Sequence, residues 1–188
     1  MCAFDGTELD IADSTANRSA CGTHGHGDKQ AGYPHLRLVA LVACGTRSLL
    51  GAAFGTIRTT ERDLALVLFG HLDAGMLVLL DRGFAAGQWF SDLHATGADF
   101  LARVPAHWKP GTVERLHDGS RLVLLGGLTL RLIEAEITIA TAGGKRTGVY
   151  RLATTLVDPD RFPALDLIEQ YLHRWEIETA YSEPFRAS

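Results

Sequence analysis

The segment Gly75-Met-Leu-Val-Leu-Leu-Asp-Arg-Gly-Phe84 predicts the centre of the fold. Residues 76–80 form an unbroken apolar run that is too short for a typical helix and is bracketed by glycines. Because both faces of such a strand are apolar, we expect it in the middle of a sheet that is covered on both sides. Asp81 then follows at the carboxyl end of the strand, where α/β sheets place their ligands. An unpaired buried carboxylate is costly, so Asp81 should be solvated, hydrogen-bonded or bound to a cation; the alternative is an ordinary turn Asp.

The composition is that of a globular domain. The chain has 188 residues, 46% of them hydrophobic and 21% charged, which is enough for a substantial core in one domain. No apolar run approaches the ~18 residues of a membrane span, and the N-terminus lacks the pattern of a signal peptide. Three cysteines without C-x-x-C spacing fit a reducing compartment, so the cytoplasm is the expected location.

Charge is distributed unevenly along the chain. The net charge is −4, but residues 101–151 hold eight Lys or Arg and four acids, which gives +4 for that segment and −8 for the remainder. The overall sign argues against a general nucleic-acid binder, whereas an acidic body with a basic segment suits a carboxylate metal site beside a phosphate-binding surface. A solvated sheet face is the alternative explanation. The basic residues are Arg103, Lys109, Arg115, Arg121, Arg131, Lys145, Arg146 and Arg151.

The first 104 residues predict elements in the order β-β-β-α-β-α-β. Asp5-Gly6-Thr7 follows the first apolar stretch and repeats the carboxylate-then-turn form of residues 80–83. Thr59 or Thr60 caps the first helix, and Trp89, Phe90 and Leu93 share one face of the second. The expected strands are Met1–Phe4, Leu36–Cys44, Leu49–Ile57, Met76–Leu80 and Phe100–Val104, and the expected helices are Thr60–His71 and Ala85–Thr96.

Residues 105–157 predict an antiparallel β insertion. Turn sequences at 117–120, 126–127 and 143–145 divide strand-like runs. The insertion carries most of the basic excess, and its last strand is expected to rejoin the main sheet. The expected strands are Val113–Leu116, Leu122–Leu125, Leu128–Ile139 and Val149–Leu156.

A glycine-rich loop, Gly22-Thr-His-Gly-His-Gly-Asp28, precedes the second strand. His24 and His26 suggest zinc, but the sequence offers no third ligand at a useful spacing, so we do not predict a zinc site here. A phosphate loop is also disfavoured, because no G-K-[ST] follows.

The last helix is expected from about Ala164 to Glu183. Tyr171, Arg174 and Glu178 lie at i, i+3 and i+7 and therefore share one face. A single Glu on a helix is often a solvated surface residue. A phenol, a guanidinium and a carboxylate aligned beside an apolar stripe instead indicate a binding site.

Two strand-end Asp residues and one helix Glu make a specific chemical set. Asp5, Asp81 and Glu178 could together hold two divalent cations about 3.5–4 Å apart. Hard oxygen ligands favour Mg²⁺ or Mn²⁺ over zinc. Such a cation pair binds the attacking and leaving oxygens of a phosphoryl transfer.

Taken in order, these motifs resemble the transposases of the insertion-sequence-4 type over essentially the whole chain. Asp5-Gly6-Thr7 is similar to their first catalytic motif, residues 32–39 to the entry of their second strand, and Gly75–Phe84 to their second catalytic block. Tyr171-x₂-Arg174-x₃-Glu178 matches the first three members of the family's Tyr-Arg-Glu-Lys signature.

The resemblance implies an α/β fold with a ribonuclease-H-like mixed sheet. Residues 1–104 would form the first part of the catalytic core, 105–157 the β-rich insertion, and 158–188 the catalytic helix and a tail. The implied activity is cut-and-paste transposition in the bacterial cytoplasm, near the nucleoid: two-metal cleavage of DNA at the element end, then attack of the 3′-hydroxyl on target DNA. The implied site assigns Asp5, Asp81 and Glu178 to two Mg²⁺ or Mn²⁺ ions, and Tyr171, Arg174, Lys145 and Arg146 to DNA.

The match fails near the C-terminus. The signature Lys is replaced by Phe185, and Pro184 should end the helix. We therefore expect a copy that is truncated at both ends, lacks the family's dimerising segment and is inactive. Two alternatives stay open: another ribonuclease-H-like nuclease, acting on RNA–DNA hybrids or junctions, and a non-catalytic DNA-binding remnant.

Overall fold

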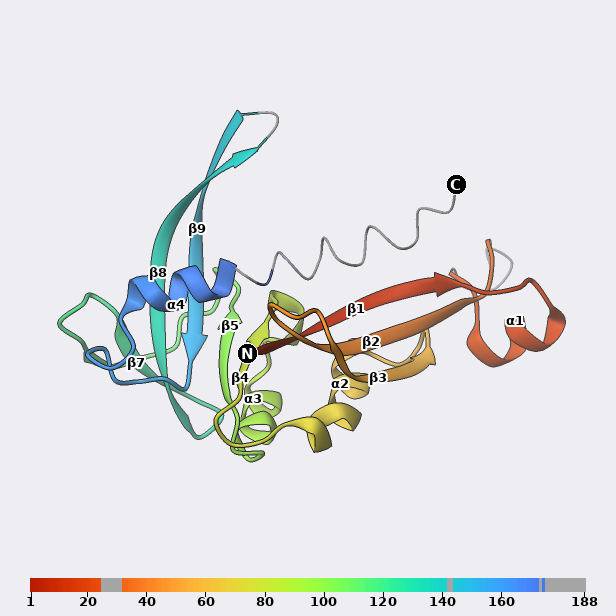
Figure 1. The fold of residues 1–188 in the computed structure, drawn as a ribbon, viewed down its shortest axis with the longest axis horizontal. Coiled ribbons are helices and arrows are strands. Elements are labelled where there is room, and N and C mark those ends of the chain that lie inside the picture. Colours follow the sequence, from red (N-terminus) through yellow and green to blue (C-terminus); the bar gives the residue numbers. More distant parts are fainter. Residues whose placement is uncertain (25–31, 142–143, 173, 175–188) are drawn as a thin grey trace.

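The computed structural model describes residues 1–24, 32–141, 144–172 and 174, with the backbone alone for 137–141 and 144–146. Within these residues the strands form one nine-stranded mixed sheet in the order β3-β2-β1-β4-β5-β9-β8-β7-β6 (Figure 1). Only the β1–β4 and β4–β5 pairs are parallel. The strands are β1 Cys2–Asp10, β2 His35–Ala43, β3 Leu49–Thr56, β4 Leu77–Leu80, β5 Asp99–Arg103, β6 Thr112–Arg115, β7 Arg121–Leu125, β8 Leu128–Thr141 and β9 Gly144–Thr154. The helices are α1 Thr15–Cys21, α2 Glu61–Val67, α3 Gly87–His94 and α4 Ala164–Leu172, with short 3₁₀ turns η2 Leu68–His71 and η3 Arg82–Phe84.

The prediction of a buried central strand is confirmed by β4. This strand pairs in parallel with β1 on one side and β5 on the other. Its side chains alternate between two apolar clusters: Val78 and Leu80 contribute to one, and Leu79 to the other. The sheet is therefore covered on both faces at its centre, and the mixed α/β class is confirmed.

Helices cover the two faces unequally (Figure 1). On one side, which we call the α2/α3 face, Leu64 of α2 and Trp89, Phe90 and Leu93 of α3 are buried. On the other side, the α4 face, Leu167 and Tyr171 of α4 are buried. The predicted buried face of α3 is thus confirmed, and α2 is capped by Thr60, whose side chain forms a capping box with Asp63.

The region between the first two strands differs from the prediction. We expected the first strand to end at Phe4, but β1 continues to Asp10 because β2 pairs with it along its whole length, from Cys2↔Ala43 to Asp10↔His35. Asp5 consequently lies inside a strand. The short helix α1 was not predicted, since it has no buried residue and therefore no apolar periodicity.

The insertion continues the main sheet. Its strands β6–β9 follow β5, and the carboxyl end of β9 pairs antiparallel with β5, which confirms that the last strand rejoins the body. The buried hydroxyl of Thr154 donates a 2.6 Å hydrogen bond to the carbonyl oxygen of Phe100 at this junction.

Three of the basic residues of the insertion form ion pairs within it. Arg121 and Arg151 both pair with Glu134, at 3.2 and 2.6 Å, and Arg131 pairs with Asp118. These three pairs support the sheet itself, and the two explanations for the excess charge stay predictions.

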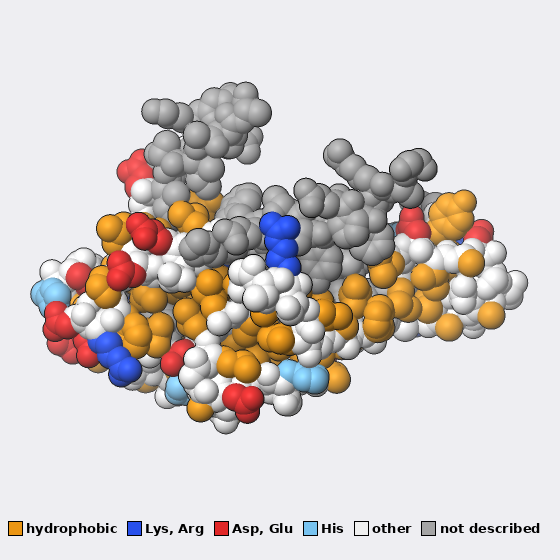
Figure 2. All heavy atoms as spheres, viewed as in Figure 1, with side chains coloured by type: hydrophobic (Ala, Val, Ile, Leu, Met, Phe, Trp, Pro, Cys, Tyr) orange, Lys and Arg blue, Asp and Glu red, His pale blue; other side chains and the backbone are white. Residues whose placement is uncertain are grey.

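Figure 2 shows the face seen in Figure 1, with hydrophobic side chains spread over its β1–β3 end. By their accessible surface, Leu49, Leu50 and Phe54 of the edge strand β3 are exposed. Among the described helices, none has both the length and the apolar character needed to cross a membrane.

Candidate active site

Asp81 sits directly after β4, at the carboxyl edge of the three parallel strands. It caps η3, and its Oδ1 accepts a 2.7 Å hydrogen bond from the backbone N–H of Gly83. A Cβ atom at position 83 would lie 3.1 Å from this oxygen, so glycine lets the carboxylate fold back over its own turn. The turn interpretation of Asp81 is therefore correct locally. Because the Gly83 bond engages Oδ1, it is compatible with a ligand role for Oδ2.

Asp5 lies beside Asp81 in the strand register. Ala3 of β1 is the parallel partner of Leu79 of β4, and the two Asp residues each follow two positions later. Since side chains alternate along a strand, both Asp residues point to the face of Ala3 and Leu79, which is the α4 face. Neighbouring strands are about 4.8 Å apart, so this register is compatible with a cation pair shared by the two carboxylates. The Oδ1 of Asp5 also accepts a 3.1 Å hydrogen bond from the N–H of Gly6.

A pocket joins Asp81 to the last helix. Its volume is about 360 Å³, and its walls are Asp81, Arg82, Gly83, Arg103, Tyr171 and Arg174. Three of the residues singled out from the sequence thus meet: Tyr171 and Arg174, which are neighbours along the chain, and Asp81, which is remote from both. Arg174 carries a guanidinium and Tyr171 a phenol, which are groups able to bind phosphate oxygens, and Asp81 carries a carboxylate.

Tyr171 anchors this pocket to the core. It is only 2% exposed and belongs to the apolar cluster of the α4 face. Burial raises the pKa of Tyr171 to about 12, against the opposing influence of the Arg174 and Arg103 charges. The hydroxyl therefore stays protonated at neutral pH and is able to donate a hydrogen bond.

Arg103 is a pocket residue that the sequence analysis counted only as part of the basic segment. It is the last residue of β5, and its guanidinium lies 4.3 Å from the ring centroid of Tyr150. The signal that could have found it is the same one that identified Asp81: a charged residue at the carboxyl end of a buried strand next to β4.

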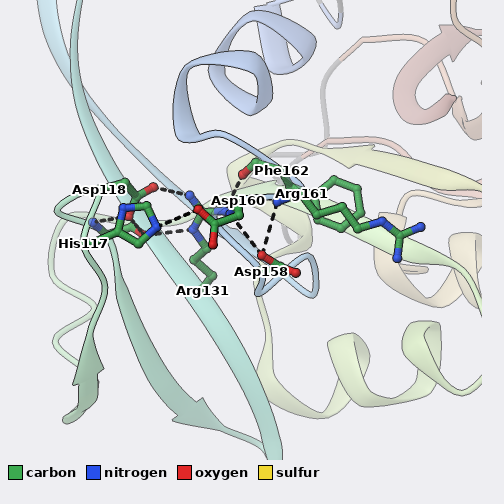
Figure 3. Close-up of polar contacts among 8 residues, drawn as sticks. His117, Asp118, Arg131, Asp158, Asp160, Arg161 and Phe162 are labelled. Atoms are coloured by element: carbon green, nitrogen blue, oxygen red, sulfur yellow. Dashed lines mark hydrogen bonds and ion pairs between the residues drawn. The ribbon is translucent and has the colours of Figure 1, made fainter.

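The position of α4 is fixed from the insertion by Arg131 (Figure 3). The side chain of Arg131 is fully buried; its Nε donates a 2.8 Å hydrogen bond to Ser120 Oγ, and its Nη1 donates one of 2.6 Å to the carbonyl oxygen of Phe162. Its Nη2 pairs with Asp118. Phe162 lies just before Pro163 and α4, so this network ties β8 to the start of the helix that carries Tyr171.

Three further contacts order the turn before α4 (Figure 3). The carboxylate of Asp158 accepts hydrogen bonds of 3.0 and 3.2 Å from the backbone N–H groups of Asp160 and Arg161. His117 lies 3.1 Å from the carboxylate of Asp160, but both side chains are exposed. The buried Arg131 network is thus the stronger link.

The structure does not describe the side chains of the remaining site residues that the sequence predicts. Glu178 lies outside the described residues. Lys145 and Arg146 are in β9, opposite Ala140 and Ile139 of β8, and only their backbone is described. Asp5 and Asp81 have the hard oxygen donors that suit Mg²⁺ or Mn²⁺, so the described part of the predicted ligand set fits those ions.

Comparisons with known proteins identify the family of this chain. The family model described as "Transposase DDE domain" matches residues 2–183. The chain is 29% identical over 201 residues to the transposase InsG of insertion sequence element IS4 from Escherichia coli (strain K12), covering 97% of this chain and 43% of that protein. In structure it is similar to a piggyBac transposase in a synaptic complex with hairpin DNA, with a TM-score of 0.56 and 12% identity, over 95% of this chain and 38% of the other. The chain spans less than half the length of both proteins. It belongs to the transposase DDE domain family.

Proposed function

We propose that this chain is the catalytic domain of an insertion-sequence-4 type transposase, which cleaves DNA at the ends of a mobile element and joins the freed 3′-hydroxyl to target DNA. The observation that carries the proposal is the pocket shared by Asp81, Tyr171 and Arg174. In this proposal residues 1–104 and 158–188 make a ribonuclease-H-like core and residues 105–157 its insertion. The proposed partners are element-end and target DNA, in the bacterial cytoplasm.

The catalytic groups are the three carboxylates. Asp5, Asp81 and Glu178 supply oxygen ligands for two Mg²⁺ or Mn²⁺ ions, which when bound activate the attacking water or hydroxyl and neutralise the leaving oxygen. Support for Asp5 and Asp81 comes from their neighbouring places on the α4 face. Glu178 enters the proposal from the helical spacing of the sequence alone.

The remaining pocket residues hold the DNA backbone. The planar guanidinium of Arg174 suits two phosphate oxygens, and Arg103 adds a second positive charge beside it. Tyr171 donates its hydroxyl hydrogen to a phosphate oxygen. Because the Tyr171 side chain is buried, the position of the donating hydroxyl is fixed. These contacts orient the scissile phosphate over the carboxylates, which is a large part of catalysis in phosphoryl transfer.

The test is a cleavage assay with three labelled substrates: a duplex carrying the element's end, an RNA–DNA hybrid and a four-way junction. Because the signature Lys is absent, we expect little cleavage by the chain as it stands. We expect Mg²⁺- or Mn²⁺-dependent nicking of the end duplex once Pro184→Ala and Phe185→Lys restore the signature, and its loss when Asp81→Asn is added. The exposed Asp73→Asn is the matched control and should leave the nicking unchanged.

Each other result decides against the proposal. Preferred cleavage of the hybrid or the junction would make the chain a different nuclease. If Asp81→Asn nicks the end duplex as fast as the protein that retains Asp81, then Asp81 is not part of the catalytic site. Binding of the end duplex without cleavage, even after Pro184→Ala and Phe185→Lys restore the signature, would identify a non-catalytic DNA-binding protein.

A further inference from the structure

A second cluster of ligand-type side chains lies at the other end of β1. Glu8 of β1, His35 at the start of β2 and His24, which follows α1, each offer one ligand atom, and these atoms lie within 4.8 Å of one another. His24 Nε2 is 2.9 Å from Glu8 Oε2, and the rings of His24 and His35 are 4.4 Å apart between centroids.

This cluster is separate from the candidate active site. Side chains alternate along β1, so Glu8 points to the same side as Phe4, which belongs to the α2/α3 face. Asp5 points to the opposite, α4 face. The sheet therefore lies between the two groups of ligands, and a cation bound by one group cannot be shared with the other.

Neighbouring residues orient the ligands as they do around bound metals. His35 Nδ1 lies 3.0 Å from Asp10 Oδ1, and a histidine that donates from Nδ1 keeps its lone pair on Nε2 for a metal. Arg37 pairs with Oε1 of Glu8, while Oε2 of the same carboxylate faces His24. Each of the three residues thus offers one ligand atom to the cluster, and Glu8 and His35 are each held by a second residue.

We propose that Glu8, His24 and His35 bind one Zn²⁺ ion, with the fourth position open to water. Two imidazoles and one carboxylate are a zinc-type donor set, whereas Mg²⁺ prefers oxygen ligands alone. The ion joins the segment after α1 to β1 and β2. The proposal is independent of the proposed transposase activity.

This site could not be identified from the sequence, because its three ligands come from three separate segments. In the printed sequence His24 has His26 as its close neighbour, and that pair offers no third ligand. The antiparallel pairing of β1 and β2, with Glu8 opposite Arg37 and Asp10 opposite His35, brings the missing ligands to His24. His26 itself lies outside the described residues.

The test measures metal binding by the tag-free 188-residue chain. Zn²⁺ is titrated in competition with a chromophoric chelator, and Co²⁺ replaces it for visible absorption spectra. All titrations use an Asp5→Ala/Asp81→Ala background, which removes the candidate active site as a competing site. We expect one Zn²⁺ per chain and an intense visible Co²⁺ spectrum typical of four- or five-coordination.

Variants separate a built site from a surface ion pair. His24→Asn, at an exposed position, and Glu8→Gln should each weaken Zn²⁺ binding more than ~10-fold, and Asp10→Asn, which only orients His35, by roughly 10- to 100-fold. The exposed His94→Ala is the control and should bind as the background does. Far-UV circular dichroism checks that each variant is folded.

Absence of stoichiometric binding would overturn the proposal and leave His24 and Glu8 as a simple ion pair. So would binding that His24→Asn and Glu8→Gln leave unchanged, or an octahedral Co²⁺ spectrum. Because the background lacks both active-site Asp residues, none of these results bears on the transposase proposal.

Discussion

Arg131 Nη1 donates a 2.6 Å hydrogen bond to the carbonyl oxygen of Phe162, and this contact connects the β-rich insertion to the helix of the candidate site. Asp118 balances the buried guanidinium from the β6–β7 turn. The insertion therefore has a structural role that is separate from any contact with DNA: it fixes the residue before Pro163 and so the start of α4. The predictions that follow test this link and the pocket that depends on it.

Breaking the Arg131–Asp118 pair should be costly, and more so from the acidic side. Asp118→Ala leaves a fully buried guanidinium without its counter-charge, which costs about 3–5 kcal/mol of unfolding free energy. Arg131→Met leaves Asp118, whose partly exposed carboxylate can be hydrated, so the loss should be smaller, about 1–3 kcal/mol. Urea unfolding measures both. Asp160→Asn, which removes an exposed pair with His117, is the control and should change little; equal losses for Asp118→Ala and Asp160→Asn would contradict the prediction.

The same carboxylate makes stability depend on acid pH. Burial alone would raise the pKa of Asp118, but hydrogen bonds from Ser120 and the charge of Arg131 outweigh it and lower the pKa below its ordinary value of 3.8. A lowered pKa means that the stabilisation is fully present above pH ~3.8 and is lost as the pH falls through the folded-state pKa. Asp118→Asn cannot titrate, so its unfolding free energy should fall less between pH 5 and pH 2 than that of the wild type. Parallel pH profiles for the two proteins would refute the assignment.

Tyr171→Phe should separate DNA binding from folding. The ring is buried, so its replacement by phenylalanine keeps the packing and leaves the thermal unfolding midpoint nearly unchanged. Loss of the hydroxyl removes one hydrogen bond to phosphate and should weaken binding of the element-end duplex by about 2- to 10-fold in fluorescence anisotropy. Tyr150→Phe, a buried tyrosine on β9, is the matched control. Because burial raises the pKa of Tyr171 to about 12, wild-type binding should show no loss from phenol ionisation up to pH 9.

In a Pro184→Ala background, which lets the helix expected from the sequence continue past residue 184, Phe185→Lys should increase cleavage. The change restores the fourth member of the Tyr-Arg-Glu-Lys signature that the sequence otherwise matches. A lysine that makes a charge-assisted contact to phosphate contributes about 1.5–3 kcal/mol, equivalent to roughly 10- to 100-fold in the nicking rate. Phe185→Gln, of similar length but uncharged, is the control, and an equal gain with both variants would argue against a charge effect.

The elements that could be read from the sequence are those whose pattern reflects burial. The apolar run at 76–80 predicts β4 because a strand covered on both faces must be apolar at every position. The spacing of Trp89, Phe90 and Leu93 predicts α3 because one side of that helix packs on the sheet. The helix α1 has no apolar pattern in the sequence, since none of its residues is buried. The length of β1 could not be predicted either, because it depends on pairing with β2, which follows α1 in the chain.

The candidate site divides in the same way. The sequence indicated the candidate residues Asp5, Asp81, Tyr171 and Arg174, because a carboxylate after an apolar run and charged groups at helical spacing are local features. Only the tertiary structure decided which of them meet and what holds them, including Arg103 at the pocket, Arg131 behind α4, and the Glu8–His24–His35 cluster on the opposite face. The physical reason is that strand register and sheet order set these distances, and both depend on pairing between segments that are remote in the sequence.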